Sequence, residues 1–65
     1  MSKVTNSYGV EIFFNAAVNL MDDDIREHLH AEGIDDEQAF FDAYAAAHEQ
    51  KFGEPWELDK PNPIY

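Results

Sequence analysis

The chain has 65 residues with 14 acids and four bases, so it is long enough for one small domain and carries a formal net charge of −10. Its 45% hydrophobic content is too high for a disordered acidic tail, its few Lys and Arg argue against binding nucleic acid or an anionic membrane, and its lack of cysteine excludes disulfides and thiolate chemistry. No apolar run approaches the ~20 residues of a membrane span and the first residues lack a signal-peptide core, so we expect one soluble, cytoplasmic domain covering residues 1–65.

The first predicted element is a short β-hairpin at residues 3–14. Val10–Ile12 alternates apolar and acidic side chains, as a half-buried strand does. The preceding stretch Asn6–Gly9 is rich in turn-forming residues, and Val4–Thr5 can provide the partner strand.

The second predicted element is a helix at residues 15–32, with Asn15 as its N-cap and Gly33 as its C-terminal stop. Apolar side chains recur at spacings of three and four residues, so they form one stripe on a helix, opposite a largely acidic face. The stripe consists of Phe14, Val18, Met21, Ile25 and Leu29.

A second helix is predicted at residues 35–52. Asp35 is the expected N-cap, and Gln38 three residues later completes a capping box, while Ile34 before the cap can pack on the first turn. Gly53 and Pro55 end the helix. Its apolar face carries Phe40, Phe41, Tyr44, Ala47, His48 and Phe52, and its flank is rich in alanine.

Residues 55–65 are predicted to form a short strand at Trp56–Leu58 followed by an extended, proline-containing tail. The two helices are joined by only a few residues and should be antiparallel neighbours. The predicted fold is therefore α+β: a hairpin, two antiparallel helices, and a C-terminal strand with a tail.

The strongest chemical feature is a cluster of eight acids within sixteen residues, opposed only by Arg26. On a helix, Asp23 and Glu27 lie one turn apart, a spacing similar to that of neighbouring phosphates on one nucleic-acid strand. One interpretation is a nucleic-acid mimic that fills a basic groove; the other is a solvated surface that keeps a small protein soluble. The cluster consists of Asp22, Asp23, Asp24, Glu27, Glu32, Asp35, Asp36 and Glu37.

Leu20 lies on the acidic side of the first predicted helix, away from the apolar stripe. It is a candidate anchor for a pocket in a partner protein. The alternative is that it packs beneath the C-terminal tail, against Ile64 or Trp56.

Catalytic and metal sites are not indicated. Glu27 and His30 have the spacing of a di-metal carboxylate site, but they lie on a polar face without the further ligands that such a site needs. His48 lies on an apolar face and is expected to be a packed side chain, because no nucleophile is placed beside it. We therefore expect no enzyme, cofactor or metal site.

Four stretches of the sequence resemble small acidic proteins of phages and mobile elements, among which are anti-CRISPR proteins acting on type I systems. They are Tyr8–Ile12 (YGVEI), Ala16–Glu27 (AAVNLMDDDIRE), Phe40–Tyr44 (FFDAY) and His48–Leu58 (HEQKFGEPWEL). The resemblance covers residues 8–58 and implies an inhibitor that binds a CRISPR effector complex, whose channels for nucleic acid are positively charged.

These observations predict a non-enzymatic inhibitor, a monomer or weak dimer, that blocks DNA recruitment by a type I effector complex. The predicted contact residues are Asp22, Asp23, Asp24, Glu27, Glu32, Asp35 and Asp36, with Leu20 as an apolar anchor. A second interpretation is an antitoxin-like or regulatory adaptor that binds through its alanine-rich flank or aromatic C-terminal tail. A metal-dependent enzyme is the third.

Overall fold

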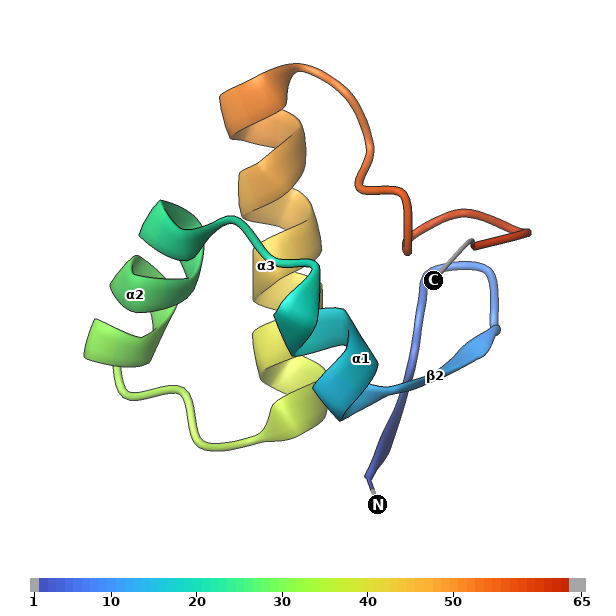
Figure 1. Ribbon diagram of the computed structural model, residues 1–65, viewed down its shortest axis with the longest axis horizontal. Helices are drawn as coiled ribbons and strands as arrows, with labels where there is room; N and C mark the ends of the chain where they lie inside the picture. The colour runs from blue at the N-terminus through green and yellow to red at the C-terminus, as the bar shows by residue number, and fades with distance from the viewer. Residues whose placement is uncertain (1, 64–65) are drawn as a thin grey trace.

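In the computed structural model, which describes residues 2–63, a two-stranded antiparallel sheet precedes three helices. Figure 1 shows α3 at the centre, with α2 on one side of it and α1 and the hairpin on the other. This arrangement confirms the predicted α+β class. Within the described residues, no helix is long and apolar enough to cross a bilayer. The elements are β1 (Lys3–Thr5), β2 (Glu11–Phe13), α1 (Phe14–Asn19), α2 (Asp23–Ala31) and α3 (Glu37–Phe52).

The N-terminal hairpin forms as predicted. Val4 lies opposite Ile12 in the register, and both are buried while their neighbours along each strand are exposed. The Asn6 amide donates to the Val10 carbonyl at 3.0 Å and closes the loop. Gly9 adopts a φ of 81°, a left-handed conformation that glycine takes without a side-chain clash. The alternating pattern of the sequence therefore places one apolar pair on the core.

The single helix predicted at residues 15–32 is wrong, because the chain forms two helices there. Between α1 and α2, Asp22 is extended (φ −64°, ψ 132°), and its carboxylate accepts a hydrogen bond from the Ile25 amide at 3.2 Å. Its own amide donates to the Tyr44 hydroxyl at 2.7 Å. Aspartate is a strong N-cap residue, so these two bonds start a new helix at this position instead of continuing the first.

Helix α1 begins without a side-chain cap. Asn15, the predicted cap, lies inside the helix, and the N-cap position is held by Phe13 at the end of β2. The Phe14 amide donates to the Ser2 carbonyl at 3.0 Å. The residue before β1 thus satisfies one of the amides that a helix start leaves free. The predicted cap fails because this helix continues directly from a strand.

The start of α3 differs by one residue from the prediction. Asp36, not Asp35, is the N-cap, and its carboxylate accepts from the Ala39 amide at 2.9 Å. Gln38 does not close a capping box. Its side-chain amide instead accepts from the Thr5 amide and donates to the Thr5 carbonyl, both at 2.8 Å. Gln38 therefore pairs with β1 as a strand backbone would and ties α3 to the hairpin.

The predicted C-terminal strand is not confirmed, since residues 54–63 form turns and bends. Trp56 and Leu58 are nevertheless fully packed into the core. Asn6 donates from Nδ2 to the carbonyls of Leu58 and Lys60 at 2.9 and 2.8 Å. Side-chain hydrogen bonds thus attach this segment to the hairpin loop, beside which it runs in Figure 1. The last two residues of the predicted tail, 64–65, lie outside the described residues. They include Ile64, a predicted packing partner of Leu20.

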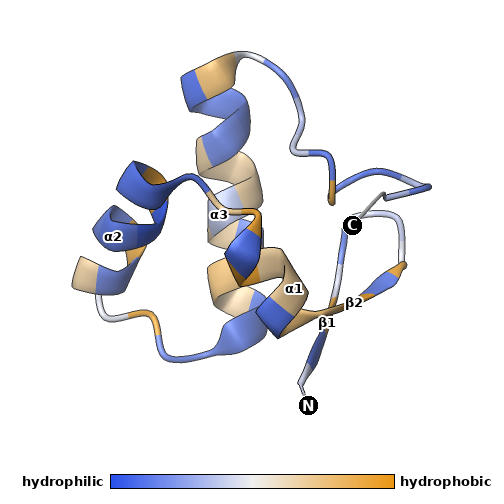
Figure 2. Ribbon diagram, in the orientation of Figure 1, coloured by the Kyte–Doolittle hydropathy of each residue, from blue (hydrophilic) through white to orange (hydrophobic). Residues whose placement is uncertain are grey.

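The hydrophobic core lies between α3, α2, α1 and the hairpin, and Trp56 closes it. The ring centroid of Trp56 lies 4.3 Å from that of Tyr44 and 5.2 Å from that of Phe41. Phe52, predicted on the apolar face, is 48% exposed. Figure 2 shows α2 as mainly hydrophilic and the half of α3 beside α1 as mainly apolar. The buried hydrophobic residues are Val4, Ile12, Ala17, Met21, Ile25, Leu29, Phe40, Phe41, Tyr44, Trp56 and Leu58.

Candidate partner-binding surface

Helix α2 directs a row of carboxylates to solvent. Its buried side chains, Ile25 and Leu29, lie on the face that packs toward α3. Asp23 and Glu27 lie on the opposite face of the helix, and Asp24 lies beside them. The side chains of Asp23 and Asp24 are 80% and 88% exposed, and Glu27 is also exposed. We call Asp23, Asp24 and Glu27 the α2 acid ridge.

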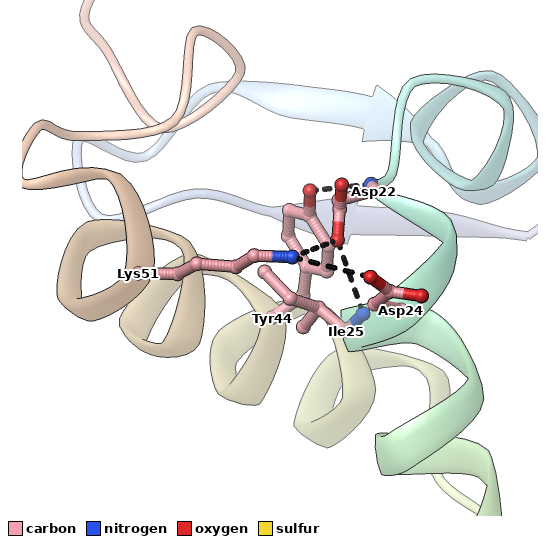
Figure 3. Close-up of polar contacts among 5 residues, drawn as sticks. All are labelled: Asp22, Asp24, Ile25, Tyr44 and Lys51. Atoms are coloured by element: carbon pink, nitrogen blue, oxygen red, sulfur yellow. Dashed lines mark hydrogen bonds and ion pairs between the residues drawn. The ribbon is translucent and has the colours of Figure 1, made fainter.

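Asp22, just before the ridge, has partners within the protein (Figure 3). Lys51 of α3 places Nζ 2.9 Å from its carboxylate and 3.7 Å from that of Asp24. The hydrogen bond from Lys51, followed by that from the Ile25 amide, lowers the pKa of Asp22, and the same bond raises the pKa of Lys51. Burial raises the pKa of Tyr44, whose hydroxyl accepts from the Asp22 amide. This predicted contact residue therefore holds α2 against α3.

The other predicted contact residues lie at the far end of α2 and in the connection to α3. Glu32 is the C-cap residue of α2, and its carboxylate lies 2.9 Å from His28 Nε2. Asp35 is exposed, one residue before the Asp36 cap. The acids that follow one another in the sequence thus extend from one end of α2 to the other and on to the start of α3.

Leu20 lies at the junction of α1 and α2 and is 40% exposed. It lines a shallow surface hollow together with Trp56 and His48. The His48 ring lies tilted by 50° against exposed Phe52, with centroids 4.6 Å apart, and its Nδ1 lies 3.2 Å from the Glu54 carbonyl oxygen. Leu20 therefore borders the C-terminal segment across this hollow and offers apolar surface beside the Asp22–Asp24 run.

The structure also contains a groove that the sequence analysis did not identify. It has a volume of about 310 Å³ and lies between α1, the end of α2 and the start of α3. The helical periodicity, together with the expected packing of Ile34 on the first turn of the next helix, assigned the apolar residues of this groove to the core. The break before α2 and the connection to α3 instead leave Phe14, Val18 and Ile34 half-buried. No local pattern in the sequence indicates this incomplete burial. The lining residues are Phe14, Val18, Arg26, His30, Ile34, Asp35, Asp36, Glu37 and Phe40.

A metal site does not form on this surface: among residues 2–63, no three His, Asp or Glu side chains are close enough together to hold an ion. His28 pairs with Glu32, and His30 lines the groove.

A family model described as "Anti-CRISPR protein AcrIC5" matches residues 5–56. These residues include the hairpin loop, β2, all three helices, the α2 acid ridge and the residues that line the groove. No curated protein matches the chain.

Proposed function

Because this chain belongs to the AcrIC5 family of anti-CRISPR proteins, we propose that it inhibits a type I-C CRISPR effector complex by mimicking nucleic acid. In this proposal, its acidic surface occupies a basic DNA-binding surface of the complex and prevents the recruitment of DNA. The protein acts in the cytoplasm of the bacterial host. Inhibition requires occupancy of the basic surface and no catalytic step.

The observation that carries the proposal is the outward row of carboxylates along α2. The three exposed acids of the ridge form this row, and Asp22 and Glu32 flank it, so that residues 22–32 carry five acids over about 15 Å of helix axis. Duplex DNA carries one charge per ~1.7 Å, so the row is sparser than DNA but has the same sign and a comparable linear form. The break in the predicted first helix does not interrupt the row, because it precedes Asp22. Effector complexes hold nucleic acid in positively charged channels, which such a row can enter.

The acids have different roles within this proposal. Asp22 and Asp36 cap α2 and α3. Their role in binding is therefore indirect, because they hold the helices that carry the other carboxylates in place. The α2 acid ridge, Glu32 and Asp35 meet the basic surface directly. Leu20 supplies an apolar contact beside the ridge, at a point where charge pairing alone gives little specificity.

The alternative of an adaptor with an aromatic C-terminal docking surface receives less support. Trp56 and Leu58, the main apolar residues of that segment, are buried in the core. Asp59 also accepts from the Ser7 amide at 2.8 Å, so removing residues 59–65 would disturb the hairpin loop as well as the tail. A truncation therefore does not distinguish the nucleic-acid mimic from the adaptor. Charge substitutions on the acidic surface do distinguish them.

The experiment compares two triple variants of equal net charge in binding to a purified type I-C effector complex. Neutralising the ridge (Asp23→Asn, Asp24→Asn, Glu27→Gln) is expected to weaken binding about tenfold or more at low salt and to reduce the salt dependence of the affinity. The ridge variant should also lose its ability to compete with target DNA.

The control neutralises three exposed acids on other surfaces, by Glu11→Gln, Asp42→Asn and Glu49→Gln. It should keep most of the affinity, because steering by net charge falls equally in both variants while the local row survives. Equal losses of affinity in the two variants would show that net charge alone determines binding. Undiminished binding by the ridge variant would refute mimicry by this surface.

A further inference from the structure

We propose that the groove between α1, α2 and α3 receives one apolar side chain of the partner protein, presented from a basic segment. This inference rests on the proposed function, to which it adds the chemistry of a second contact. A leucine, methionine or phenylalanine would fill the groove while neighbouring Lys or Arg side chains meet the acids at its edge.

The apolar part of the groove is formed by side chains from three different segments. Phe14 and Val18 come from α1, Ile34 from the connection after α2, and Phe40 from α3. The rings of Phe14 and Phe40 meet edge to face, with centroids 6.1 Å apart and planes at 89°. Aromatic pairs in this geometry are mutually stabilising, so the groove has a defined wall. An apolar side chain entering the groove would exchange contact with water for contact with these four side chains.

The charges at the edge of the groove select the partner. The carboxylates of Asp35 and Glu37 make no hydrogen bond or ion pair to another side chain within residues 2–63. The Asp36 carboxylate accepts a hydrogen bond from the Ala39 amide. Among the described residues that line the groove, Arg26 is the one permanent cation, and it pairs with Asp23 at 3.0 Å. The edge is therefore net negative and attracts a cationic peptide segment. A phosphate backbone is repelled, and so is a second copy of this chain with its own charge of −10.

The test is a titration of two five-residue peptides into the isotope-labelled protein, followed by the amide resonances. One peptide has leucine between two Lys-Arg pairs, and the other has serine in that position. The leucine peptide should bind ~10- to 100-fold more tightly, the gain from burying one apolar side chain, and should shift the resonances of Val18 and Ile34. Equal affinities, or shifts confined to the α2 acid ridge, would overturn the inference.

Two variants fill the groove from different sides, Val18→Trp and Ile34→Trp, so that one poorly folded variant does not decide the result. Each should abolish the preference for leucine while retaining weak binding of both peptides. Ala46→Phe, which adds an aromatic ring to an exposed position of α3 outside the groove, should change neither affinity. A self-association of the unaltered protein that these two variants remove would assign the groove to a second copy and overturn the inference.

The effector complex separates this inference from the proposed function. A groove-filled variant should bind the complex about tenfold more weakly with an unchanged salt dependence, since no charge is altered. If groove-filled variants bind as well as the unaltered protein, the inference fails while the proposed function stands. If the unaltered protein does not bind the complex but its groove selects the leucine peptide, the proposed function fails and the selectivity of the groove is retained.

Discussion

At the scale of single residues, Asp22 connects the acidic surface to the fold. Its carboxylate caps α2 and pairs with Lys51, while its amide is bound by Tyr44. The sequence presents it as the first of three identical acids, yet its two neighbours are almost fully exposed. The difference comes from α3, which is distant in sequence: its Tyr44 bonds to Asp22, and its Lys51 lies 2.9 Å from the Asp22 carboxylate but 3.7 Å from that of Asp24.

We predict that Lys51→Met raises the pKa of Asp22 toward its ordinary value. The Lys51 hydrogen bond is the largest cause of the lowered pKa, so its loss should move the carboxyl titration midpoint upward, as measured by carbon-detected NMR. A carboxyl whose pKa is lowered in the folded state contributes stability above its unfolded pKa and loses it as the pH falls through the folded pKa. The unaltered protein should therefore gain more stability than the variant as the pH rises from 2 to 5.

Lys60→Met is the matched control for this titration. It removes the same charge from a lysine whose amine makes no ion pair within the described residues. The midpoint of Asp22 should stay where it is in the unaltered protein. Identical midpoints in the unaltered protein and in the Lys51→Met variant would refute the assigned cause.

At the scale of elements, the hairpin and α3 could be predicted from local patterns, because alternation, capping residues and Gly53 act over short distances. The division of α1 from α2 carried a readable signal in Asp22–Asp24, where an N-cap and two first-turn acids follow one another. The regular spacing from Phe14 to Leu29 masked it, since both arrangements bury most of that stripe. The C-terminal segment could not be predicted, because its position depends on Asn6, more than 50 residues away.

We predict that Asn6→Ala lowers the free energy of unfolding by about 2–4 kcal/mol. The Asn6 side chain is 5% exposed and makes four hydrogen bonds: two to carbonyls of the C-terminal segment and two from the amides of Tyr8 and Val10. Alanine leaves these groups without a partner and frees the segment that carries Trp56. Thermal or urea unfolding measures the loss, and weakened near-ultraviolet circular dichroism reports the release of Trp56.

Asn19→Ala controls for the chemistry of the substitution, because Asn19 is exposed at the end of α1. It should change the stability by less than about 0.5 kcal/mol. If both variants unfolded alike, Asn6 would have no special part in holding the hairpin loop to the C-terminal segment.

At the scale of the whole molecule, the acidic character of the site followed from the sequence, while its shape did not. Eight acids within sixteen residues make this stretch acidic whether it forms one helix or two. The groove, by contrast, exists only because α1, α2 and α3 meet at angles that leave Phe14, Val18 and Ile34 incompletely covered. Such a feature depends on tertiary packing, which periodicity within one element does not specify.

The same excess of charge sets a prediction for the stability of the molecule. The protein measures 29 × 29 × 17 Å, so at 0.01 M salt, with a screening length of ~30 Å, its ten excess negative charges repel one another across the whole structure. At 0.15 M the length falls to ~8 Å and most of this repulsion disappears. Few ion pairs oppose the trend, since Lys51 and Arg26 supply the main ones. We expect the melting temperature to rise by roughly 5–10 °C with sodium chloride over this range. The ridge-neutralised variant should gain less, and a fall in melting temperature would mean that ion pairs outweigh the repulsion.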